Sequence, residues 1–265
     1  MYQKHWGLKK LPFENTPDTE FFFESEKHEE AFSRLSYVVD EKKSCAVLTG
    51  NYGTGKTLVL KALEREFKKK GYVFSFVQNP RLDDLGLLKM ILHNFTGYNV
   101  PKQKEDVLMG IERFLRDTFQ DGKHVVVAID EAQLINDENV LEELRLLLNF
   151  QTETRFLLTL LLSGQPELRE KLDSNKQFSQ RITLSYRLQP LDFAETRKYV
   201  EHRLEVAGLA ENIFDEKAME LLYERSGGIP RWINNIANMS MLTAFSKGEK
   251  IITEALVAEG VESSK

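Results

Sequence analysis

The chain has 265 residues, 42% of them hydrophobic, and a formal net charge of −5. This composition predicts an ordinary globular core in one large domain or two smaller ones. The acidic balance excludes an overall positive field that would attract nucleic acid or anionic lipid, so any basic surface has to be local. No segment approaches the roughly 20 apolar residues of a membrane helix, and the single cysteine, Cys45, lies in an apolar run. These features predict a cytoplasmic setting in which that thiol is a reduced core residue.

Short apolar runs and segments of helical period alternate up to about residue 190. The runs predict five strands, which begin at Ser44, Tyr72, His124, Arg155 and Arg181. Helices are expected between them at residues 57–70, 82–95, 107–120 and 138–150. Near-continuous apolar strands that alternate with helices are typical of a parallel sheet covered on both faces. We therefore expect an α/β domain with a five-stranded parallel sheet over residues 1–190.

A different pattern follows this α/β part. Strand signals stop, and helices are expected at residues 193–207, 216–225 and 231–246, with a shorter one near the C-terminus. Gly208, Gly227 and Gly248 separate these segments as helix C-caps do. Residues 191–265 are therefore expected to form a small helical domain.

The strongest single signal is the stretch GNYGTGKT, which begins at Gly50. It fits the pattern G-x-x-x-x-G-K-[ST] and falls between an expected strand and an expected helix, as a phosphate-binding loop requires. Its glycines allow a tight turn in which backbone N–H groups and a helix N-terminus face phosphates. The residues expected to contact ATP are Gly50, Asn51, Tyr52, Gly53, Thr54, Gly55, Lys56, Thr57 and Leu58. Lys56 is expected to reach the β- and γ-phosphates, and Thr57 to bind Mg²⁺.

Two carboxylates end a second apolar run, VVVAIDE, where packing alone would continue apolar residues. We expect Asp130 to hold the Mg²⁺ shell and Glu131 to orient the attacking water, a pair that favours hydrolysis over binding alone. A further strand is expected to lie between the two strands just named and to end in a polar side chain that senses the γ-phosphate. Ser163 and Gln165 both fit that sensor role, and the sequence does not rank them.

The order of these elements resembles the AAA+ superfamily, in which a P-loop core is followed by a helical lid. In the segment GGIPRWINNIAN, Arg231 matches the position from which such proteins send an arginine to the γ-phosphate. Arg181, just before the last expected strand, matches the arginine finger that reaches a neighbouring subunit's nucleotide, with Arg187 and Arg169 as alternatives. The resemblance thus implies a homo-oligomer that forms with ATP.

The whole chain looks like the ExeA/GspA-type ATPases of general secretion and the related pilus-biogenesis ATPases. The matching stretches include YQKHWGLKKLPFENTPDTEFFF, LTGNYGTGKTLV, AIDEAQ, LLSGQPELREKL and QRITLSYRLQPL. This resemblance implies an ATPase that powers or regulates assembly of a secretion or pilus complex at the inner face of the inner membrane. It also implies an adenine pocket that includes Phe13, Pro17, Phe21, Phe22 and Phe23, although an aromatic cluster of this kind is more often plain core. Typical members continue through a membrane helix into a peptidoglycan-binding region. The sequence does not decide whether this chain is a shorter relative of such proteins or a fragment of one.

Two other functions fit the same motifs. One is a DNA-associated ATPase that regulates transposition, since such proteins share DEAQ-like and GGIPR-like elements, although the charge balance does not favour DNA. The other is a scaffold that binds ATP with negligible turnover, against which the intact Lys56, Asp130 and Glu131 argue.

Overall fold

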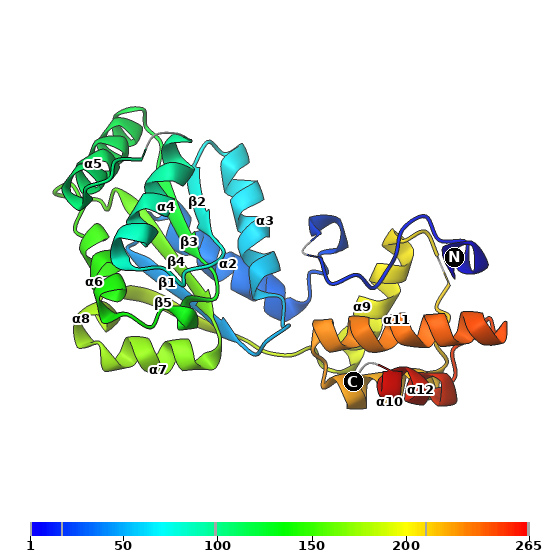
Figure 1. Ribbon diagram of the computed structural model, residues 1–265. Helices are drawn as coiled ribbons and strands as arrows, with labels where there is room; N and C mark the ends of the chain where they lie inside the picture. Colours follow the sequence, from blue (N-terminus) through cyan, green and yellow to red (C-terminus); the bar gives the residue numbers. More distant parts are fainter. Residues whose placement is uncertain (1, 17, 98–99, 210, 264–265) are drawn as a thin grey trace. The chain divides into compact units, whose positions relative to one another are not determined.

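The structure is a computed structural model that describes residues 2–16, 18–97, 100–209 and 211–263. The described chain forms two compact units (Figure 1). The sheet unit comprises Glu30–Asn51 and Val59–Leu188, and the helical unit comprises residues 1–29, Tyr52–Leu58 and Gln189–Lys265. Residues 1–29, which we expected within the first domain, thus group with the helices that follow Gln189. The phosphate-binding turn groups with those helices as well.

The sheet unit contains five parallel strands in the part of the chain that the structure describes. They are β1 Cys45–Gly50, β2 Val73–Val77, β3 Val125–Ile129, β4 Leu158–Gly164 and β5 Ile182–Leu188. Their order in the sheet is β2-β3-β4-β1-β5. Each begins within three residues of the position that the apolar runs predict, so the predicted α/β fold with a five-stranded parallel sheet is confirmed.

Burial along the strands explains why apolar runs in the sequence predicted them. Every residue of β1, β3 and β4 is buried, because helices cover both faces of the sheet. The edge strand β5 instead alternates between exposed and partly buried residues. Cys45 opens β1 with a fully buried side chain, as expected for a core thiol.

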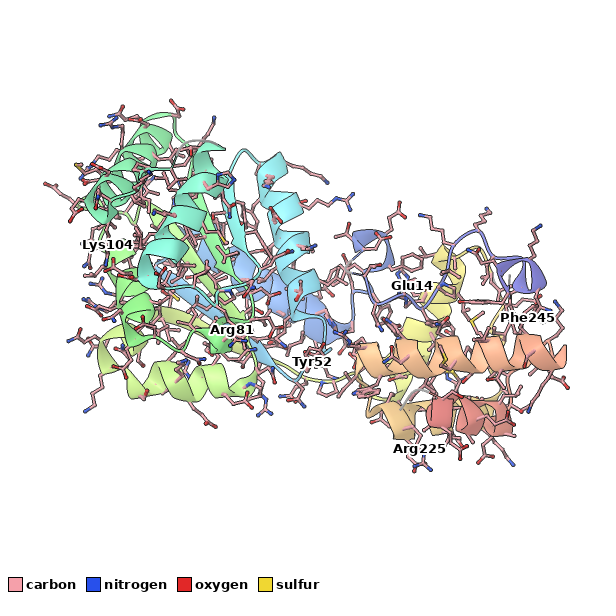
Figure 2. All side chains as sticks on the ribbon, viewed as in Figure 1. Glu14, Tyr52, Arg81, Lys104, Arg225 and Phe245 are labelled. Atoms are coloured by element: carbon pink, nitrogen blue, oxygen red, sulfur yellow. The ribbon has the colours of Figure 1, made fainter. Side chains whose placement is uncertain are left out.

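Helices connect these strands and enclose the sheet. They are α2 Glu26–Asp40, α3 Lys56–Lys69, α4 Asp84–Thr96, α5 Lys104–Gln120, α6 Glu138–Leu147, α7 Pro166–Ser174 and α8 Lys176–Ser179, with a short 3₁₀ turn, η2, at Ala132–Leu134. One apolar core joins alternate residues of β1, β3 and β4 to α4, α5, α6 and α7, while α2 and α3 lie on the other face (Figure 1). Lys104 at the start of α5 donates to the carboxylates of Asp84 and Glu143, which connects α5 to α4 and α6 (Figure 2).

The helical unit is built from both ends of the chain. Its helices are α1 Tyr2–Trp6, α9 Phe193–Val206, α10 Glu216–Ser226, α11 Pro230–Lys247 and α12 Glu254–Ser263, with a short 3₁₀ turn, η1, at Thr19–Phe21. Trp6 and Phe13 belong to the same apolar core as these helices, and the Phe13 ring meets the edge of the Phe214 ring at 6.3 Å. The N-terminal aromatic residues Phe13 and Phe21 are therefore buried core, while Pro17 lies outside the described residues. Among the described residues, no helix combines the length and the apolar character needed to span a bilayer.

A buried arginine fastens the N-terminal segment to α9. Arg203 is only 5% exposed. Its guanidinium donates to the carbonyls of Pro12 and Glu14 and to the Tyr199 hydroxyl, and it lies 4.7 Å from the centre of the Phe21 ring (Glu14 is labelled in Figure 2). One side chain thus satisfies two carbonyls of an otherwise irregular segment.

Arg203→Leu is expected to destabilise the helical unit, because it removes the guanidinium donor of the Pro12 carbonyl and leaves the Glu14 carbonyl with only the longer bond from Asn234 at 3.5 Å. Each hydrogen bond to a charged group contributes roughly 1.5–3 kcal/mol. The free energy of unfolding, measured by urea denaturation, should therefore fall further in Arg203→Leu than in a control variant. Arg197→Leu on the same helix is that control, since its ion pair with Glu216 is exposed and such pairs contribute about 1 kcal/mol or less. Equal losses in the two variants would contradict this role of Arg203.

Candidate nucleotide-binding site

Three neighbouring strands, β3, β4 and β1, carry predicted site residues at their carboxyl ends. Strand β4 lies between β1 and β3, as expected for a sensor strand. Ser163 near its end pairs with Leu48 of β1, and Leu162 pairs with Ile129 of β3. Because all strands are parallel, Gly50, Asp130 and Ser163 lie at the same carboxyl edge, where open α/β sheets bind their ligands.

The phosphate-binding turn has a backbone that only glycine adopts easily. Gly53 and Gly55 have φ angles of 82° and 101°. A Cβ at Gly53 would lie 2.6 Å from Cβ of Arg231, and a Cβ at Gly55 would lie 2.8 Å from Nε2 of His28. Helix α3 begins at Lys56, directly after this turn, so the N-terminus of a helix, where anions are favoured, lies at the turn. The local geometry therefore suits a phosphate cradle.

Arg231 in the first turn of α11 contacts the phosphate-binding turn. Its backbone N–H donates to the Gly53 carbonyl at 3.3 Å. Its guanidinium lies 4.6 Å from the centre of the ring of Tyr52, an exposed residue labelled in Figure 2, a cation–π arrangement. The structure thus brings the predicted arginine together with the loop that it was expected to serve.

The acidic pair follows β3 on a strained backbone. Asp130 is 4% exposed, its backbone N–H donates to the Val77 carbonyl, and its Oδ1 accepts from the N–H of Glu131 at 3.0 Å. Glu131 has a φ of 51°, in the left-handed region that costs a non-glycine residue about 1 kcal/mol or more. Such strain is found where a side chain has to point in a fixed direction for function.

Gln133 holds the Glu131 carboxylate, a contact that the sequence analysis missed. Its Nε2 donates to Oε2 of Glu131, and its Oε1 accepts from the backbone N–H of Gln165 at 3.1 Å. A Cβ at Gly164 would lie 2.5 Å from that Oε1, so this bridge needs a glycine there. Gln133 therefore ties the acidic pair after β3 to the end of β4. The advance signal was its place in the matching stretch AIDEAQ, within which the sequence analysis gave Gln133 no role.

The two sensor candidates have different environments. The Ser163 side chain is fully buried, and its hydroxyl has no hydrogen-bond partner among the described residues. Buried hydroxyls are nearly always paired, so an orphan at the carboxyl edge is suited to an incoming polar group. Gln165 is the N-cap residue of α7 and its side chain makes no capping bond. These environments favour Ser163 over Gln165.

Arg181 lies at the opposite edge of the sheet. Its neighbour Ile182 pairs with Cys45, the first residue of β1, whereas Gly50 at the other end of β1 pairs with Leu188. At about 3.3 Å per residue, that separation is roughly 17 Å along the strand. The guanidinium donates to Asn149 at 2.8 Å. The structure does not bring Arg181 to the carboxyl edge of its own sheet.

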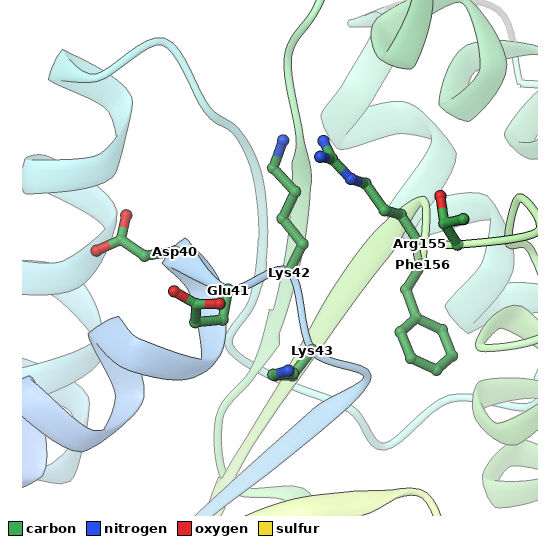
Figure 3. A pocket seen from close by; sticks show the side chains of 7 residues that line it. Asp40, Glu41, Lys42, Lys43, Arg155 and Phe156 are labelled. Carbon is green, nitrogen blue, oxygen red and sulfur yellow. The ribbon is translucent and has the colours of Figure 1, made fainter.

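The other two arginines considered for this role are placed differently. Arg169 of α7 forms an ion pair with Asp173 at 2.8 Å, and Arg187 is exposed on β5. A pocket of about 420 Å³ also lies at the amino edge, lined by residues 40–43 and 154–156 just before β1 and β4 (Figure 3). Its lining mixes acidic and basic side chains, and it is separate from the candidate site at the carboxyl edge.

Comparison with known proteins agrees with this geometry. The chain is 37% identical over 254 residues to General secretion pathway protein A of Aeromonas hydrophila, an alignment that covers 94% of this chain and 46% of that protein. The chain thus spans less than half the length of that relative. Among solved structures, the Aeropyrum pernix ORC2 protein in its ADP form is similar with a TM-score of 0.66 at 18% identity, covering 98% of this chain and 72% of that one. The Thermotoga maritima RuvB Holliday junction branch migration motor is similar with a TM-score of 0.62 at 17% identity, covering 91% of this chain and 70% of that one.

The likeness to the solved structures is one of fold, since their identities are low. A family model described as an AAA domain matches residues 39–172, the span that runs from the end of α2 through β1 and the acidic pair to α7. By that match the chain belongs to the AAA domain family, as an AAA+ protein of the type of General secretion pathway protein A.

Proposed function

We propose that the chain binds ATP with Mg²⁺ and hydrolyses it at the carboxyl edge of its sheet. The observation that carries this proposal is that three neighbouring strands end at that edge. Strand β1 ends in Gly50 before the phosphate-binding turn, β3 is followed by Asp130 and Glu131, and β4 carries the orphan hydroxyl of Ser163. In this proposal residues 1–190 supply the nucleotide-binding core and residues 191–265 the lid that brings Arg231.

Each predicted residue has a distinct role in the proposed reaction. Lys56 and the N–H groups of the turn bind the phosphates, and Arg231 adds a second cation near the γ-phosphate. Mg²⁺ fits the hard oxygen donors of Thr57 and Asp130, which would hold it, and when bound it neutralises charge on the β- and γ-phosphate oxygens.

Glu131 is the proposed base for the attacking water. The water oxygen forms a bond to the γ-phosphorus, the bond to the β–γ bridging oxygen breaks, and the proton goes to the Glu131 carboxylate, which leaves ADP and phosphate. Gln133 limits how that carboxylate turns, and Ser163 is the proposed sensor, with Gln165 second.

Lys56→Ala and Glu131→Gln should separate binding from hydrolysis. Loss of the Lys56 charge is expected to weaken ATP binding roughly 10- to 100-fold, since a hydrogen bond to a charged group contributes about 1.5–3 kcal/mol. Glu131→Gln should keep ATP affinity but slow turnover about 100-fold or more, as for loss of a general base. Titration calorimetry and a phosphate-release assay measure the two quantities, with Lys68→Ala on the same helix as control. Equal loss of ATP affinity in both variants would contradict the assigned roles.

We further propose that Arg181 acts on the nucleotide of a neighbouring copy of the chain. Its place at the amino edge keeps it from the carboxyl edge of its own sheet, so a catalytic role needs a second subunit. Arginine fingers supplied by a partner stabilise charge on the transferring phosphoryl group. Hydrolysis would then require a homo-oligomer that assembles with ATP.

Arg181→Ala is expected to bind ATP normally and to hydrolyse it at least about 100-fold more slowly, in keeping with arginine fingers. Mixing it with Lys56→Ala subunits, which retain Arg181, should restore part of the phosphate release. Arg187→Ala, on the exposed side of β5, is the matched control and should retain normal turnover. No recovery in the mixture would count against action on a neighbour.

The similarity to General secretion pathway protein A supports a role in assembling a secretion or pilus complex, on the cytoplasmic side of the inner membrane. Regulation of transposition on DNA is the second candidate, because the chain carries the DEAQ-like and GGIPR-like elements of such proteins; among the solved structures of similar fold is an ORC1 protein in complex with DNA. We favour the secretion role, since identity to the secretion protein is 37% and identity to the DNA-bound structure is 18%.

Turnover measured with and without duplex DNA distinguishes the two roles. We expect no DNA-dependent stimulation and only weak binding that disappears between about 50 and 200 mM salt, the behaviour of non-specific phosphate contacts. Fluorescence anisotropy with labelled duplex DNA measures the binding. An ATP-dependent complex that survives the higher salt concentration would instead support the DNA-associated role.

A further inference from the structure

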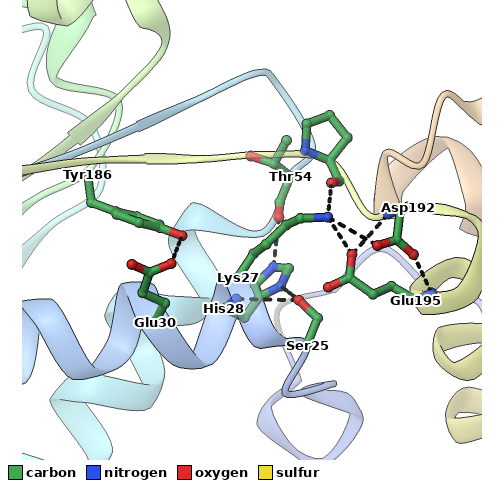
Figure 4. A network of polar contacts seen from close by, with 9 residues as sticks. Ser25, Lys27, His28, Glu30, Thr54, Tyr186, Asp192 and Glu195 are labelled. Atoms are coloured by element: carbon green, nitrogen blue, oxygen red, sulfur yellow. Dashed lines mark hydrogen bonds and ion pairs between the residues drawn. The ribbon is translucent and has the colours of Figure 1, made fainter.

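Two successive carbonyls of the phosphate-binding turn accept hydrogen bonds from outside the turn. The Gly53 carbonyl accepts from the backbone N–H of Arg231 at 3.3 Å. The Thr54 carbonyl accepts from Nε2 of His28 at 2.9 Å (Figure 4). Both donors belong to the helical unit, as does the turn itself. The sequence analysis assigned no role to His28.

The hydrogen bonds of His28 define which nitrogen carries its proton. A carbonyl oxygen can only accept, so Nε2 must donate to Thr54. Nδ1 lies 2.7 Å from Oγ of Ser25, and that oxygen also accepts from the backbone N–H of His28 at 3.4 Å. In the neutral ring the Ser25 hydroxyl therefore donates to Nδ1, which completes a chain from Ser25 to the turn. Burial of the ring lowers the pKa of His28, which keeps it neutral.

The first turn of α2 holds His28 in place. The Ser25 carbonyl accepts from the N–H of Glu29 at 2.8 Å, which closes that turn. Lys27 donates to the Pro190 carbonyl at 3.0 Å and pairs with Glu195 in the capping box of α9 (Figure 4). His28 is 5% exposed. It is thus a rigid donor and not a loose surface group.

Fixing a carbonyl also fixes the N–H of the same peptide unit. A trans peptide is planar, and its C=O and N–H point in opposite directions. The bond from His28 to the Thr54 carbonyl therefore sets where the N–H of Gly55 points. In the same way, the bond from Arg231 to the Gly53 carbonyl sets the N–H of Thr54. Both N–H groups are turned away from their supports, as donors to an anion in the turn must be.

We propose that His28 is a positioning residue for nucleotide binding, which holds the phosphate-binding turn in its anion-binding shape by fixing the Thr54–Gly55 peptide from behind. The inference rests on the proposed ATP binding. A turn that is ordered beforehand loses less conformational entropy when it binds, so affinity is gained without a new contact to the ligand. Gly55 is suited to this support, because any Cβ there would meet Nε2 of His28 at 2.8 Å.

A pair of polar substitutions separates this role from plain packing. In His28→Gln the amide nitrogen can occupy the position of Nε2 and donate to the Thr54 carbonyl. In His28→Asn the shorter side chain reaches only the position of Nδ1, next to Ser25. Both variants are polar and smaller than histidine, so their effects on folding should be similar. His124→Asn is the matched control, since His124 is also buried and its ring bonds to the Thr159 hydroxyl in the sheet unit, away from the turn.

Binding of ATP with Mg²⁺ to the full chain is measured by titration calorimetry, together with kcat and KM for phosphate release and the free energy of unfolding. We expect His28→Asn to weaken ATP affinity and raise KM about tenfold, the effect of roughly one lost hydrogen bond, while kcat stays within about twofold because the reacting groups are untouched. His28→Gln should recover most of the affinity. His124→Asn should lose stability without losing affinity.

Two results would overturn the inference. Equal ATP affinity in His28→Gln and His28→Asn would show that the bond to Thr54 does not matter for binding. A comparable loss of affinity in His124→Asn would show that affinity only follows overall stability. If the unaltered chain bound no ATP, the proposed function and this inference would fall together, whereas in the two former cases only the role of His28 fails.

Discussion

The direction of a few backbone amides is the constraint on which the proposed activity depends. N–H groups that face a phosphate have carbonyls that face away, and buried carbonyls need donors of their own. Here the donors come from His28 and from the backbone of Arg231, both in the helical unit. The turn is therefore shaped by segments from the two ends of the chain, although it follows directly from β1, an interior strand of the sheet. Residues 1–29 belong to the same unit as the C-terminal helices, and Arg203 bonds to their Pro12 and Glu14 carbonyls.

A second set of constraints operates at the carboxyl edge of the sheet. The left-handed backbone at Glu131 is a local cost, and Gln133 fixes the resulting direction of the carboxylate by bridging to the N–H of Gln165. This bridge passes where a side chain at Gly164 would otherwise stand. The end of β4, with the orphan hydroxyl of Ser163, is thereby connected to the proposed base. If β4 senses the γ-phosphate, as we propose, Gln133 is the hydrogen-bonded link from the end of that strand to the carboxylate.

The sequence was informative wherever structure follows from local pattern. Apolar runs predicted all five strands, and the glycine-rich motif and the acidic pair predicted the polar strand ends, because backbone geometry and burial leave a mark within a few residues. Contacts between residues far apart in the chain could not be predicted from local pattern. Examples are the contact of Phe13 with Phe214 and the hydrogen bond from Arg203 to the Pro12 carbonyl. The role of His28 depends on one nitrogen reaching a backbone oxygen 26 positions along the chain. The sequence analysis did not predict helix α2, Glu26–Asp40, although its apolar residues recur at helical spacing.

The most direct test of the central claim compares a non-hydrolysable ATP analogue with AMP, each titrated calorimetrically into the full chain with Mg²⁺. If the turn binds a triphosphate, nearly all the polar contacts go to the β- and γ-phosphates, which AMP lacks. We predict that the analogue binds at least about 100-fold more tightly than AMP, since each hydrogen bond to a charged group contributes about 1.5–3 kcal/mol. Equal affinity for the two ligands, or no binding of either, would contradict the assignment of this turn as a triphosphate site.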